Sequence, residues 1–176
     1  AVTQHDYRVL TPDHASPEQI RGDPITTASD TYVLGVLLYE LLCGCKPFAL
    51  KGNRLGDLER AICEEPPPPP SVVIQAREDS PGIARQRGTT PARLRRELAG
   101  DLDNIVLMAM RKEPDRRYSS VEQFAAGGLE NQLAAAAAGP VELLRVDAAF
   151  EAVRRRAVQV ELAGRAPDRH WSEFGH

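Results

Sequence analysis

The sequence has no apolar run long enough to cross a membrane, and its longest alanine run, Ala134 to Ala138, falls far short of a span. Its first residues lack the basic start and the apolar middle of a secretory signal. These two absences predict a cytoplasmic chain.

Cysteine and net charge are also scarce. The three cysteines are odd in number, and the spacing of Cys43, Cys45 and Cys63, with no neighbouring histidine, is poor for a metal site. The formal charge of −3 gives no attraction to phosphate backbones, and the basic clusters 93–96 and 154–156 have no aromatic residues among them. We therefore expect free thiols, no bound metal and no nucleic-acid partner.

No convincing strand pattern occurs, whereas helical periodicity is frequent. In the segment from Thr26 to Gly44, apolar residues cover nearly all sides, which predicts a helix buried at the centre of a domain. Thr27 or Ser29 can cap its start, and Gly44 suits the turn after its end. Further helices are expected over about 17–21, 55–62, 101–112, 119–129 and 141–162.

Two neighbouring stretches show no helical period. The proline run Pro66 to Pro70 fits either an ordinary surface or a polyproline segment for an aromatic-lined groove. From Ser71 to Arg93 the pattern predicts a long surface loop. The sequence therefore predicts an all-α fold with a structureless connection in its middle.

Three stretches in a fixed order resemble a known family. They are "TPDHASPEQ", "SDTYVLGVLLYELLCGCKPF" and "GDLDNIVLMAMRKEPDRRYSS". They resemble the activation-segment end, the central helix and the following helix of the C-terminal lobe of bacterial eukaryotic-like protein serine/threonine kinases. The resemblance implies a truncated kinase-like C-lobe over residues 1–133, and a C-terminal helix and tail of unknown role over 134–176.

The resemblance implies two structural roles. Glu18 of the Ser-Pro-Glu motif pairs with Arg117 in the family, and this ion pair ties the activation segment to the lower lobe. Asp30 of the Asp-x-x-x-x-Gly signature anchors the backbone of the catalytic loop. Taken without the resemblance, both acids are ordinary helix-start carboxylates.

The resemblance also implies roles for three positions in the first twelve residues. Thr11 and Pro12 match the loop that positions the protein substrate, although His14 stands where the family usually has tyrosine. Thr3 lies where an activation-loop phosphorylation site could lie. The resemblance thus implies positioning residues and no catalytic residue in this chain.

The motifs that bind and transfer phosphate are absent from the sequence. The family needs a glycine-rich loop, a strand lysine, a His-Arg-Asp catalytic loop and an Asp-Phe-Gly metal site, all of which precede Thr11 in family order. Mg-ATP is the cofactor of the intact family, and we expect this chain alone to bind none and to be inactive. The alternatives are a non-catalytic interaction module built on a kinase lower lobe, or the product of a degenerate reading frame.

The missing elements would pack on the central helix. Their absence is expected to expose part of Val33, Leu37 and Leu41 beside an unpartnered Asp30. This surface predicts self-association or a protein partner, with no membrane partner.

Overall fold

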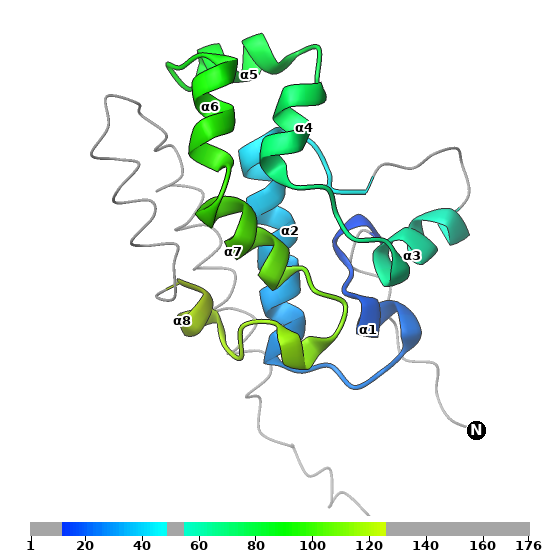
Figure 1. The fold of residues 1–176 in the computed structure, drawn as a ribbon. Coiled ribbons are helices and arrows are strands. Elements are labelled where there is room, and N and C mark those ends of the chain that lie inside the picture. Colours follow the sequence, from blue (N-terminus) through cyan, green and yellow to red (C-terminus); the bar gives the residue numbers. More distant parts are fainter. Residues whose placement is uncertain (1–11, 49–54, 126–176) are drawn as a thin grey trace, which may run out of the picture.

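The computed structural model describes residues 12–48 and 55–125. These residues form α-helices and two short 3-10 helices, and no strand occurs among them, which confirms the all-α prediction (Figure 1). The elements are η1 (Pro12–His14), α1 (Pro17–Arg21), α2 (Thr27–Cys43), α3 (Leu55–Glu64), α4 (Pro70–Ala76), α5 (Ser80–Gln86), α6 (Pro91–Leu98), α7 (Asp101–Ala109), η2 (Pro114–Arg116) and α8 (Val121–Phe124). In this part of the chain, no helix is long and apolar enough to cross a membrane.

Helix α2 runs through the middle of the fold, as predicted (Figure 1). Its N-cap is Thr26, not Thr27 or Ser29, because the Thr26 side chain accepts from the N–H of Ala28 while its own N–H donates to Ser29 Oγ. Gly44 ends the helix with a φ of 67°, a conformation that favours glycine. The sequence thus located the helix correctly, but the two candidate caps lie one and three positions after the actual N-cap.

Helix α7 packs closely against α2 at Gly35. A Cβ atom on Gly35 would lie 2.8 Å from Ala109 Cβ and 3.0 Å from Met110 Cγ. Only glycine therefore fits this helix crossing without a shift of α7. Five apolar residues of the stretch expected as a helix over 101–112 lie in the core: Leu102, Ile105, Val106, Ala109 and Met110.

The stretch from Ser71 to Arg93 is not the predicted loop. It contains α4, α5 and the start of α6, and it buries Ile74 and Ala84 in the same core as α2. Each of these helices has a proline in its first turn, where the missing N–H costs no hydrogen bond. With seven or eight residues apiece, the helices are too short to show a clear period in the sequence.

One helix end differs from expectation, and one helix start agrees with it. Helix α7 stops at Ala109, so Arg111 and Lys112 lie beyond it and not in its last turn. Helix α8 starts after Ser120, whose hydroxyl accepts from the N–H of Gln123. The expected continuation of this helix to Leu129 and the helix over 141–162 lie outside the described residues.

Candidate functional site

Glu18 and Arg117 form a bidentate ion pair. Arg117 Nη1 lies 2.7 Å from Glu18 Oε1, and Arg117 Nη2 lies 2.8 Å from Oε2. Both residues are buried, at 3% and 5% exposure. Glu18 comes from the first turn of α1, and Arg117 directly follows η2, so the pair joins segments 99 positions apart.

Every N–H group of the Arg117 guanidinium has an acceptor. Beyond Glu18, Nη1 donates to the Ala28 carbonyl (2.9 Å), Nη2 to the Lys112 carbonyl (3.0 Å) and Nε to the Arg111 carbonyl (2.6 Å). The guanidinium also lies 4.9 Å from the centre of the buried Tyr32 ring. A single side chain thus holds α1, the start of α2 and the loop after α7 together.

The environment of Glu18 favours its ionised form. Burial alone would raise the pKa of the carboxyl group, but the hydrogen bonds from Arg117 and Ser29 outweigh burial and lower this pKa to about 2. The pair is therefore charged throughout the neutral and mildly acidic range. A buried pair with every donor satisfied is a structural clamp, since no hydrogen-bonding capacity of the guanidinium remains for a substrate.

Lys112 makes a second connection that the sequence pattern did not reveal. Its Nζ donates to the Ile62 carbonyl at 2.7 Å near the end of α3 and lies 4.4 Å from the centre of the Phe48 ring. Burial lowers the pKa of Lys112 to about 8. The loop after α7 is thereby joined to α3 as well as to α1. A lysine beside a helix end gives no sequence signal for a contact 50 positions away.

The segment expected to position a substrate lies beside the end of α2. Pro12 opens η1, and His14 Nε2 lies 3.3 Å from Glu40 Oε1 of α2. Asp13 forms an ion pair with Lys46. Thr11 and the possible phosphorylation site Thr3 lie outside the described residues, so their roles stay predictions.

Asp30 lies half-buried on α2, and burial raises the pKa of its carboxyl group. Within the described residues no hydrogen bond to this carboxylate is present. On the same helix Leu41 is 39% exposed, while Val33 and Leu37 are half-buried. The apolar stripe is thus open mainly at Leu41, and a partner for it stays a prediction.

Cys43, Cys45 and Cys63 are free thiols, as predicted, and Cys43 is buried. In the described ranges no three histidine, cysteine or acidic side chains are grouped as metal ligands.

The geometry can be compared with known proteins. No protein-family model matches the chain. Serine/threonine-protein kinase PknB of Mycobacterium tuberculosis is 38% identical over 127 residues, which are 72% of this chain and 16% of that kinase. PknB of Mycolicibacterium smegmatis is 32% identical over 126 residues, which are 72% of this chain and 16% of that kinase. The kinase pkn3 of Myxococcus xanthus is 31% identical over 126 residues, which are 72% of this chain and 19% of that kinase.

This chain is a relative of the bacterial serine/threonine-protein kinases. It corresponds to part of their C-terminal lobe, and the all-α architecture agrees with that placement. The chain spans about 16% of the mycobacterial kinases that it matches.

Proposed function

We propose that these residues are the structural part of a protein serine/threonine kinase domain, which in its intact form transfers a phosphoryl group from Mg-ATP to protein serine or threonine. The observation that carries this proposal is the buried Glu18–Arg117 pair, found in a chain related to bacterial kinases. In this role the pair holds the end of the activation segment against α2 and the loop after α7. The substrate-positioning residues Thr11 and Pro12 lie a few positions before this clamp.

We further propose that a polypeptide of only these 176 residues is catalytically inactive. Its sequence contains no glycine-rich phosphate loop, no His-Arg-Asp loop and no Asp-Phe-Gly motif. Calorimetry with Mg-ATP should show no saturable binding, and a labelled-phosphate assay with a general acceptor protein should show no transfer. Saturable micromolar binding, or transfer that is lost on Asp30→Asn, would contradict this part of the proposal.

The proposed role in a kinase domain can be tested only in a protein that also has the phosphate-binding and catalytic motifs. We suggest replacing the matching segment of Mycobacterium tuberculosis PknB with residues of this chain and measuring phosphate transfer to a general acceptor. The chimera should be active, and Glu18→Gln in it should lower both activity and thermal stability. A chimera that is folded by circular dichroism yet inactive at every ATP concentration would contradict the kinase assignment.

A non-catalytic interaction module is the second candidate, supported by the exposed Leu41 and by the half-buried Asp30, whose carboxylate accepts no hydrogen bond from the residues that the structure describes. Light scattering and hydrophobic-dye binding by the full chain should then change on Leu41→Ser. A monomeric, dye-silent chain would argue against self-association through this stripe.

A further inference from the structure

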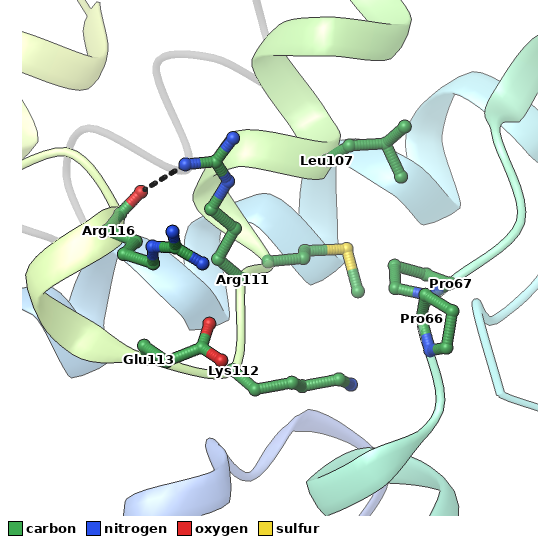
Figure 2. Close-up of a pocket in the computed structure, with 8 residues that line it drawn as sticks. Pro66, Pro67, Leu107, Arg111, Lys112, Glu113 and Arg116 are labelled. Atoms are coloured by element: carbon green, nitrogen blue, oxygen red, sulfur yellow. Dashed lines mark hydrogen bonds between the residues drawn. The ribbon is translucent and has the colours of Figure 1, made fainter.

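A pocket lies between the end of α7 and the proline run that follows α3. Its volume is about 350 Å³, within the range of ligand sites, which begins at roughly 300 Å³. It is lined by Pro66, Pro67, Leu107, Met110, Arg111, Lys112, Glu113 and Arg116 (Figure 2). None of the residues that form the ion pair described above lines it.

The lining includes a continuous apolar part. Met110 and Pro67 are buried, Leu107 is half-buried, and Pro66 is exposed. In Figure 2 the two prolines lie on one side of the group of lining residues, and Arg111 and Arg116 lie on the other. Such a surface suits a bulky apolar side chain, because occupation would remove apolar area from water.

Arg111 and Arg116 line the opposite rim of the pocket, and their guanidinium groups make few hydrogen bonds to the described residues. Both are exposed, and Arg111 Nη1 donates to the carbonyl oxygen of Arg116 at a long 3.4 Å. In the described part of the chain neither guanidinium pairs with a carboxylate. Guanidinium groups present several N–H donors that match the two oxygens of a carboxylate. The rim is therefore suited to an anionic group.

The other charged groups of the pocket restrict the kind of anion. Lys112 turns its Nζ toward the Ile62 carbonyl, so its aliphatic stem faces the pocket. Glu113 is exposed in the same rim and makes no ion pair among the described residues. A carboxylate in this position repels a polyanion but accepts hydrogen bonds from peptide N–H groups.

The wall of the pocket is held in place before any ligand arrives. Arg117 donates to the carbonyl oxygens of Arg111 and Lys112, and its other donors bind Glu18 and Ala28. A fixed wall reduces the entropy that binding must overcome.

We propose that this pocket binds a short extended peptide segment of another protein, with an acidic residue next to a bulky apolar residue. The charge complementarity is specific: the peptide carboxylate meets Arg111 and Arg116, its apolar side chain covers Leu107 and the prolines, and Glu113 accepts a peptide N–H. A free anion would leave the apolar part of the pocket in water. The proposal goes beyond the kinase assignment and does not depend on it.

The test is fluorescence anisotropy with the full 176-residue chain and a labelled six-residue peptide. The peptide has a central Leu-Phe pair with one acidic residue directly before it and one directly after it, and a serine at each end. The double variant Arg111→Glu/Arg116→Glu should bind at least tenfold more weakly, because each lost charged hydrogen bond weakens binding substantially. Leu107→Ser should also weaken binding. Arg96→Glu, an exposed change on α6 outside the pocket, is the matched control and should bind as the unaltered chain does.

Circular dichroism and thermal midpoints should show that all variants remain folded. Equal binding by the double variant and the Arg96→Glu control would overturn the proposal. So would equal binding of a peptide with lysines in place of its acidic residues, or displacement of the peptide by inorganic phosphate at the same concentration as by unlabelled peptide. A dimer that dissociates on Arg116→Glu would assign the pocket to a second copy of this chain and would also overturn it.

Discussion

Two buried polar contacts stabilise different parts of this fold, and they do so in different ways. The Glu18–Arg117 pair joins α1 to the loop after α7 through two full charges. The Ser71–Asp103 contact joins the first turns of α4 and α7, with Ser71 donating its N–H (3.0 Å) and its hydroxyl (2.6 Å) to one carboxylate. Only the first contact contains a buried cation.

The difference determines what each contact loses when one partner is removed. Without Arg117, the Glu18 carboxylate is left buried with its main partner gone, which is costly for a charged group. Without the Ser71 hydroxyl, Asp103 keeps the hydrogen bond from the Ser71 backbone N–H. The ion pair should therefore be the more fragile contact, although both lie in the same core.

The largest effect is expected for Arg117→Ala. It should lower the free energy of unfolding by about 3 to 5 kcal/mol, because it breaks a buried pair from one side. Arg116→Ala is the matched control, since Arg116 is exposed one position earlier, and it should change stability by no more than about 0.5 kcal/mol. Urea midpoints measure both. Equal shifts would mean that the pair contributes no more than a surface contact.

Acidification should weaken the pair without any mutation. The pKa of Glu18 is about 2 in the folded chain against an ordinary value of 4.5, a difference worth about 3 kcal/mol. Because the folded value is the lower one, this stability is fully present above pH 4.5 and is lost as the pH falls toward 2. Urea unfolding of the unaltered chain and of Glu18→Gln over this window provides the test. A constant difference between them would contradict the expected titration.

Ser71→Ala should have an intermediate effect. It removes one hydrogen bond to a charged group but leaves the backbone bond, so we expect a loss of about 1 to 2 kcal/mol. Ser119→Ala removes a hydroxyl from an exposed position and should cost less than about 0.5 kcal/mol. A loss for Ser71→Ala as large as that for Arg117→Ala would remove the distinction between the two contacts.

Replacing Arg87 should give the smallest loss in the free energy of unfolding. It also separates an arginine that binds only neutral carbonyl oxygens from Arg117, which binds a carboxylate. The Arg87 guanidinium donates to the carbonyl oxygens of Leu41 and Leu42 at the C-terminal end of α2. The helix dipole stabilises a cation at this end. Arg87→Ala should cost about 1 kcal/mol, since only neutral acceptors lose a partner and nearby solvent can replace it. Arg85→Ala on the exposed side of α5 is the control, and thermal unfolding of both variants measures the difference. A larger loss than for Ser71→Ala would contradict this ranking.

The sequence predicted the parts of the fold that carry strong local signals. The helix expected over 17–21 is present, and Ser16 and Gln19 form a capping box at its start, with the Ser16 N–H donating to Gln19 Oε1 at 2.8 Å. The long helix α2 was predicted from its apolar composition, and its end was predicted from Gly44. These features depend on residues within a few positions of one another.

The region from α4 to α6 could not be predicted in the same way. Its short helices bury few residues each, and their packing depends on Ser71 meeting Asp103 and on Arg87 meeting the end of α2. Such contacts join residues 32 or more positions apart and leave no periodic trace. Glu18 and Arg117 lie even further apart, at 99 positions, and the family resemblance predicted their contact although periodicity could not.

The claim that the Glu18–Arg117 pair holds α1 on the helical core is tested most directly by a double-mutant cycle. Glu18→Ala, Arg117→Ala and the double variant should be compared by their free energies of unfolding in urea. Each single variant should lose several kcal/mol and the double variant little more than either, which gives a coupling of at least about 2 kcal/mol. Additive losses within about 0.5 kcal/mol would show that the two residues stabilise the fold independently, and would contradict the account.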